Sequence, residues 1–400
     1  MNIRLLALCA AACFVAAIAA QTDVAPLADP LTMADGTKVT SAAQWRNQRR
    51  PELLALFTRE IFGVAPPRSP KQSFVVFDKG SDALGGKAIR RQVTLLLNGD
   101  PKGPRFDLLV YIPKAAKGRV PAILGINFSG NHAITTDPGV RITSNPAESG
   151  RGVNAAQWPV EEMLDRGYAL ATFYRGDVDP DTKDGFDKSL KAFYPELQNR
   201  GDNFSTIGEW AWALSRALDY LATDRAIDAR RVAAFGWSRL GKAALWAGAT
   251  DERFAAAISN ESGAGGAKLF HRGMGENITR LNTVFPHWYD QNFRKYNERD
   301  TTLPFDQHEV IALIAPRAVY IASAVQDANS DPEGEFAAAK AAEPVFLLLG
   351  KQGLGVEKWP AVDHPVGGDI AYHVRSGGHD VKAFDWEQYL RFLDKHLRGK

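Results

Sequence analysis

The sequence has very little cysteine and almost no excess of charge of either sign. Its 400 residues include only two cysteines, Cys9 and Cys13, and both lie among the first 20 residues. The rest of the chain therefore has no disulfide, no thiol chemistry and no cysteine metal site. The formal net charge is +2. A nucleic-acid or membrane-surface partner calls for clustered lysine and arginine, so we expect neither.

Long apolar runs are also scarce, because the only one occupies residues 5–20. Its 16 residues fall short of the ~20 that span a bilayer, and no basic stop-transfer cluster follows. Arg4 precedes the run and small residues end it. We interpret residues 1–20 as a signal peptide cleaved near Ala19 or Ala20. The mature chain is then expected to be secreted or periplasmic and not bound to a membrane.

Strand and helix patterns alternate along the remaining chain. Apolar runs predict strands near residues 108–112, 122–127, 168–173, 232–235, 255–259, 318–322 and 371–374. Helical periodicity falls between them, most clearly at 206–223, where Thr206 and Glu209 match a capping box. Such alternation predicts an α/β fold, a mostly parallel sheet with helices on both faces. We expect one domain over residues 21–400, with the helix and strands of 21–105 packed on it.

Residues 231–248 (RVAAFGWSRLGKAALWAG) have the layout of a nucleophile elbow. A predicted strand stops at Gly236, Ser238 follows, and a buried helix begins. The helix start offers free N–H groups and positive potential where an oxyanion would form. Leu240 occupies the place of the usual second glycine, and Gly241 lies one position later. The loop at 128–132, after an early strand, is either a second oxyanion donor or a surface turn.

A hydrolytic serine requires a base and an acid, which follow it in that fold in the order acid, histidine. His379 lies on a glycine-rich loop after the last predicted strand, so we expect it to be the base. Two carboxylates could orient it. Glu261 ends the strand after the elbow helix, and Asp327 follows the next strand, at the more usual position of the acid.

At this point the sequence resembles one family. Residues 236–242 (GWSRLGK) resemble the elbow of the glucuronoyl esterases, carbohydrate esterase family fifteen, and explain the displaced glycine. The resemblance extends to NESGAGG at 260–266, GEN at 275–277, DPEGEF at 331–336 and SGGHD at 376–380. It implies an α/β-hydrolase that cleaves esters joining 4-O-methyl-glucuronic acid of xylan to lignin alcohols, with Ser238 as nucleophile and His379 as base.

The resemblance also implies roles for further residues. Glu261 matches the usual acid, while some bacterial members use an aspartate at the place of Asp327. Arg239 would help to bind the oxyanion. Lys242 and Glu276 would hydrogen-bond the uronate hydroxyls, although Lys242 could also be an ordinary exposed lysine. Many bacterial members carry a sugar-stacking tryptophan at the place of Asn329, which leaves the substrate range of this chain open.

Taken together, the sequence predicts a serine esterase acting on glucuronoxylan or on lignin–carbohydrate esters. We favour Glu261 as the main acid, with Asp327 as second candidate. No cofactor is implied, and a monomer is expected. A metal site is not expected either, because the candidate set lacks helical or finger spacing: Asp363, His364, His373 and Asp380. The alternatives are an acetyl or feruloyl xylan esterase on the same fold, and a non-catalytic carbohydrate-binding protein.

Overall fold

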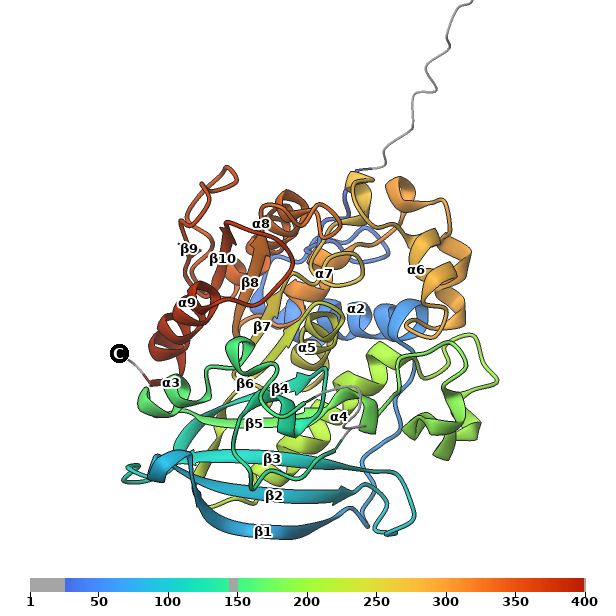
Figure 1. Cartoon of the computed structure of the whole chain (residues 1–400). Helices are drawn as coiled ribbons and strands as arrows, with labels where there is room; N and C mark the ends of the chain where they lie inside the picture. The colour runs from blue at the N-terminus through green and yellow to red at the C-terminus, as the bar shows by residue number, and fades with distance from the viewer. Residues whose placement is uncertain (1–25, 144–149, 399–400) are drawn as a thin grey trace, which may run out of the picture.

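A ten-stranded sheet runs through the protein in a computed structural model that describes residues 26–143 and 150–398 (Figure 1). The expected signal peptide lies outside the described residues. The strand order is β1-β2-β3-β5-β4-β6-β7-β8-β10-β9. The strands are β1 (Ser73–Ala83), β2 (Ala88–Leu96), β3 (Arg105–Pro113), β4 (Val120–Asn127), β5 (Ala169–Tyr174), β6 (Ile227–Trp237), β7 (Ala256–Asn260), β8 (Ala318–Ala324), β9 (Val366–Gly367) and β10 (Ile370–Arg375).

The six neighbouring strands from β5 to β10 in this order are all parallel, and the outer pairings are antiparallel. The prediction of a mostly parallel α/β-hydrolase sheet is therefore confirmed. β1, β2 and β3 continue that sheet at one edge, at the bottom of Figure 1. The register pairs Trp237 with Asn260, Asn260 with Ala322, and Ala322 with His373. Residues that follow β6, β7, β8 and β10 consequently emerge at one end of the sheet.

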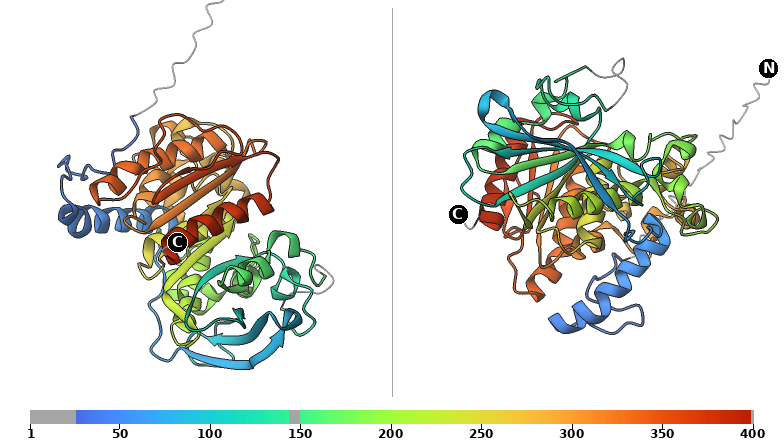
Figure 2. Two further views of the ribbon diagram at one scale, coloured as in Figure 1. Left: turned by 90° about the vertical axis from the view of Figure 1, so that its left-hand side faces the viewer. Right: turned by 90° about the horizontal axis from the view of Figure 1, so that it is seen from below.

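Helices cover both faces of the sheet (Figures 1 and 2). Apolar residues of α3 and α9 form the core on one face, and those of α4, α5, α7 and α8 form the larger core on the other. The helices are α1 (Ala42–Gln44), α2 (Arg50–Phe57), α3 (Val160–Asp165), α4 (Thr206–Leu221), α5 (Arg239–Thr250), α6 (Ile278–Val284), α7 (Gln307–Ala312), α8 (Pro332–Leu348) and α9 (Ala383–Leu393).

Helix α4 differs from its prediction in two respects. Its N-cap is Ser205, whose Oγ accepts from the N–H of Gly208, so the capping box predicted at Thr206 and Glu209 is wrong. The Glu209 carboxylate accepts instead from the N–H of Lys191, at 2.8 Å. All sixteen residues of the helix are buried, not one face alone. Glu209 thus anchors the segment before the helix.

The segment between β7 and β8 contains helices α6 and α7, which the sequence did not predict.

In the described part of the chain, no helix combines the length and the apolar composition needed to cross a membrane.

Candidate active site

Ser238 lies at a sharp turn between β6 and α5, with φ 57° and ψ −132°. That backbone conformation is unusual for a residue with a side chain and is the strain expected of a nucleophile elbow. A Cβ on Gly236 would lie 1.9 Å from the Leu240 carbonyl oxygen, so the turn requires glycine there. A Cβ on Gly241 would approach Ser262 to 3.0 Å. The displaced second glycine thus allows α5 to pack closely against the loop after β7.

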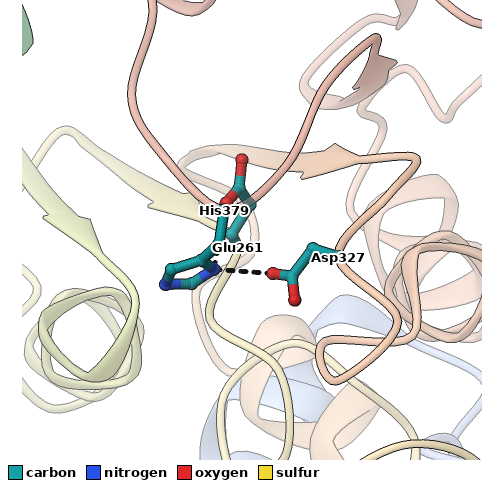
Figure 3. Close-up of side chains that lie close together, drawn as sticks. All are labelled: Glu261, Asp327 and His379. Carbon is teal, nitrogen blue, oxygen red and sulfur yellow. Dashed lines mark hydrogen bonds and ion pairs between the residues drawn. The ribbon is translucent and has the colours of Figure 1, made fainter.

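Both acid candidates meet the predicted base at one nitrogen (Figure 3). His379 lies on the loop after β10, and its Nδ1 is 2.6 Å from Asp327 Oδ2 and 3.0 Å from Glu261 Oε2. The side chain of His379 is 39% exposed, so part of the ring is open to solvent while the two carboxylates contact Nδ1. This arrangement can fix one tautomer and stabilise the imidazolium form.

The two carboxylates have different surroundings. Glu261 is buried, and one of its oxygens pairs with the guanidinium of Arg375 at the end of β10. Its other oxygen accepts from the N–H of Asp380 at 2.9 Å. Burial raises the pKa of Glu261, although His379 and Arg375 oppose this shift. Glu261 is therefore tied into the framework as well as facing His379.

Asp327 is tied less firmly. Its Oδ2 accepts from Ser330 Oγ at 2.5 Å as well as from His379. Burial would raise the pKa of Asp327, but the hydrogen bonds from His379 and Ser330 outweigh burial and lower it. The sequence favoured Glu261 as the main acid, whereas the shorter distance and the readier ionisation both favour Asp327.

These contacts also shift the pKa of the expected base, His379. Burial would lower the pKa of His379, but the hydrogen bonds to Asp327 and Glu261 raise it to about 9. Glu261, Asp327 and His379 have ligand atoms within 4.8 Å of one another and could geometrically hold a metal ion. The same atoms are already engaged with each other, which is the arrangement of a catalytic histidine with the carboxylates that orient it.

A cavity of about 260 Å³ opens in front of Ser238. Lys242, one helical turn beyond Ser238, is buried in its wall and donates to the carbonyl oxygens of Ser262, at 2.8 Å, and Ala264. An ammonium group has three donors, and the described residues accept from two of them, which leaves one for a ligand. Burial lowers the pKa of Lys242 to about 8. The cavity is lined by Ser238, Arg239, Lys242, Glu261, Ser262, Gly263, Glu276, Phe285, Trp288, Asp327, Asn329, Ser330 and His379.

Glu276 and Asn329 form one side of this cavity together. The N–H of Glu276 donates to the carbonyl oxygen of Asn329 at 3.2 Å. A Cβ on Gly275, whose φ is 63°, would lie 2.5 Å from that same oxygen. Glycine is thus needed at 275 for the two loops to meet. All the sequence-predicted site residues lie around this single cavity.

Arg239 is held by residues that the sequence did not indicate. Its Nη1 donates to Asp181 Oδ2 at 2.6 Å, and its guanidinium carbon lies 4.8 Å from the ring centre of Trp288. Trp288 stacks on Phe285 with centroids 3.8 Å apart. Both aromatic residues line the cavity. Their only signal in the sequence is a cluster of aromatic residues at 285–289, in a segment without clear periodicity.

Glu335 supports the loop that carries Glu261. It is buried, and its carboxylate accepts from the N–H of Gly263 at 2.8 Å and from Ser323 Oγ at 2.6 Å. Burial raises the pKa of Glu335 to about 8. The segment at 331–336, which only the family resemblance had indicated, therefore positions the loop after β7.

The loop at 128–132 lies beside the elbow. The ring of Phe128 packs edge-on against Trp237, with centroids 5.2 Å apart. The N–H of Gly130 donates to Asn127 Oδ1 at 2.8 Å. That the loop at 128–132 provides a second oxyanion donor stays a prediction.

Three comparisons relate the chain to known proteins. The family model "Glucuronyl esterase, fungi" matches residues 99–350. A carbohydrate esterase from an unknown prokaryotic organism is 46% identical over 398 residues, covering 95% of this chain and 91% of that protein. The 4-O-methyl-glucuronoyl methylesterase of Podospora anserina is 30% identical over 74% of this chain, which spans 54% of that protein.

A solved structure extends the likeness to the fold. The glucuronoyl esterase from Solibacter usitatus superposes with a TM-score of 0.88 at 44% identity, covering 92% of this chain and 97% of that one.

Proposed function

Because this chain belongs to the glucuronoyl esterase family and is a carboxylic ester hydrolase, we propose that it hydrolyses esters of 4-O-methyl-glucuronic acid. Its substrates would be the ester links between glucuronoxylan and lignin alcohols. The observation that carries the proposal is the cavity that Ser238 and His379 line together with a buried lysine, Lys242. A buried cation with a spare donor suits a hydroxylated or anionic acid half.

The reaction would proceed by two acyl transfers. His379 accepts the proton of Ser238 Oγ as this oxygen attacks the ester carbonyl. The tetrahedral oxyanion is stabilised by the N–H groups at the start of α5 and by the guanidinium of Arg239. His379 then protonates the leaving alcohol. Water, deprotonated by His379, then attacks the acyl-enzyme. The bond from the acyl carbon to Ser238 Oγ breaks, His379 returns the proton to that oxygen, and the uronic acid leaves.

Asp327 acts as the main partner of His379 in this scheme. Support comes from its 2.6 Å contact and its lowered pKa. Glu261 is a second partner at 3.0 Å whose charge is shared with Arg375. Two anions beside one imidazole would stabilise the imidazolium that forms during attack.

Lys242 and Glu276 would recognise the hydroxyls of the uronate. Asn329 takes the place at which many bacterial relatives carry a stacking tryptophan, and Trp288 offers an aromatic ring on another wall of the cavity. The ring of Trp288 would then supply the apolar contact with the sugar.

The test compares hydrolysis of benzyl glucuronate with that of p-nitrophenyl acetate. We expect a much higher kcat/KM on the glucuronate ester, and none of that activity in Ser238→Ala. A preference for the acetate would indicate the acetyl or feruloyl esterase alternative. Absence of hydrolysis of either ester would indicate a non-catalytic carbohydrate-binding protein.

The enzyme would work outside the cytoplasm, as the apolar run at 5–20 suggests, and as a monomer. Detection of the mature chain, beginning near Gln21, in the periplasm or the medium would test its export. Light scattering of the purified chain would test its oligomeric state.

A further inference from the structure

Asp181 is a buried carboxylate beside the cavity and outside every motif discussed above. It lies on the segment between β5 and α4, in the left-handed conformation with φ 61°. Its side chain is 2% exposed. A residue with a side chain keeps this conformation only where surrounding contacts hold it there.

Four donors from three segments converge on the Asp181 carboxylate. Arg239, at the start of α5, donates at 2.6 Å. Arg175, after β5, lies at 3.1 Å. From the segment after α6, Trp288 Nε1 donates to Oδ1 at 2.7 Å, and His287 Nε2 lies 3.1 Å from the same oxygen. One carboxylate thus joins the nucleophile helix to the aromatic wall of the cavity.

We propose that Asp181 is a positioning residue, which fixes the guanidinium of Arg239 over the aromatic wall at the place where the oxyanion forms. The inference rests on the proposed role of Arg239. An arginine side chain has many rotamers, and that of Arg239 is 29% exposed. The carboxylate holds one edge of the guanidinium, while Trp288 and Phe285 lie 4.8 and 5.5 Å from its carbon.

The contacts around Asp181 keep its carboxylate ionised. Burial opposes its ionisation, but the hydrogen bond from His287 and the charges of Arg239 and Arg175 lower the pKa of Asp181 to about 2. Its carboxylate is therefore anionic throughout the pH range in which an esterase works. The carboxylate and the two rings all lie close to the guanidinium of Arg239, so a free guanidinium ion should be able to bind there when that side chain is removed.

Chemical rescue tests this directly. Arg239→Ala should lower kcat by ~10²–10³, as loss of an oxyanion donor does. Guanidinium chloride, far below unfolding concentrations, should restore part of that kcat. In Arg239→Ala/Asp181→Asn the rescue should disappear. The matched control is Arg239→Ala/Asp184→Asn, which removes an exposed carboxylate of the same segment and should leave the rescue intact.

A double-mutant cycle supplies the second readout. Asp181→Asn should lower kcat by ~10-fold or more with little change in KM when Arg239 is present, and should lower it no further in Arg239→Ala. If Asp181→Asn does not fold, Asp181→Glu takes its place in the rescue assay. This variant keeps the negative charge but moves the carboxylate, so it should weaken the rescue by guanidinium.

The outcomes separate the two proposals. The positioning role is overturned if rescue survives loss or displacement of the Asp181 carboxylate. It is also overturned if Asp181→Asn lowers kcat equally with Arg239 present and in Arg239→Ala. In either case the role of Arg239 stands. Full kcat in Arg239→Ala overturns both.

Discussion

The pair of carboxylates beside His379 makes a graded prediction, because the two differ in distance and in their other partners. Removing the sole orienting carboxylate of a triad lowers turnover by up to ~10⁴. In Asp327→Asn, Glu261 remains 3.0 Å from Nδ1. We therefore expect a smaller loss of kcat, about 10²-fold, and a loss approaching ~10⁴ only in the double variant.

The same substitution should move the pH profile. His379 must be neutral to accept a proton, so kcat/KM rises as pH passes through its pKa. That pKa is raised to about 9 by the two carboxylates. Without the negative charge of Asp327 the pKa of His379 falls, and the acidic limb of the profile shifts to lower pH.

Glu261→Gln should instead act mainly on stability. It leaves Arg375 buried with Asp385 as its remaining carboxylate, at 2.8 Å. Breaking a buried pair typically costs about 3–5 kcal/mol, and we expect the lower end because Asp385 stays. The melting temperature should therefore fall more than in Asp327→Asn, whereas kcat should fall less.

The assay measures kcat on benzyl glucuronate across pH, together with thermal unfolding, for both single variants and the double variant. A larger loss of kcat in Glu261→Gln than in Asp327→Asn, with unfolding unchanged, would refute the reasoning and restore Glu261 as the main acid.

Three further predictions concern the nucleophile, the lysine and the base. Ser238→Ala should reduce esterase activity by several powers of ten with nearly unchanged melting temperature, and substantial residual turnover would exclude Ser238 as nucleophile. Lys242→Ala should cost ~1–3 kcal/mol in kcat/KM on glucuronate esters and little on acetates; equal losses would mean that the lysine only shapes the site. Because the pKa of His379 is raised from 6.5 to about 9, its ion pairs should stabilise the fold fully below pH 6.5, and this contribution should be lost as pH rises through about 9. The difference in melting temperature between the wild type and His379→Gln, followed across pH, measures it.

The sequence was informative where local chemistry determines structure. Ser238 could be placed because a strand, a glycine turn and a helix follow one another within a few residues, and His379 because it follows the last strand. The parallel register then brings the two together. The resemblance to a family supplied Lys242 and Glu276, which no periodicity would have indicated.

Contacts between distant segments could not be read in this way. Asp181 and Trp288 are 107 positions apart and meet only through the tertiary fold. The capping box expected at Thr206 and Glu209 is wrong for the same reason, because the Glu209 carboxylate accepts from Lys191 N–H and Ser189 Oγ of an earlier segment. The ranking of Glu261 over Asp327 rested on motif length, whereas the shorter distance from His379 to Asp327 and the pairing of Glu261 with Arg375 favour Asp327.

The size of the cavity has a consequence for the leaving group. At about 260 Å³ it is smaller than the ~300–1,000 Å³ clefts that enclose drug-sized ligands, and we expect it to hold little more than a single sugar ring. The alcohol half of the ester must then protrude into solvent. Rates across a series of alcohols should follow the acidity of each alcohol, in a linear free-energy relation, more than its shape. Such a site would need to admit only the uronic acid unit, while a polymer attached to it stays outside the cavity.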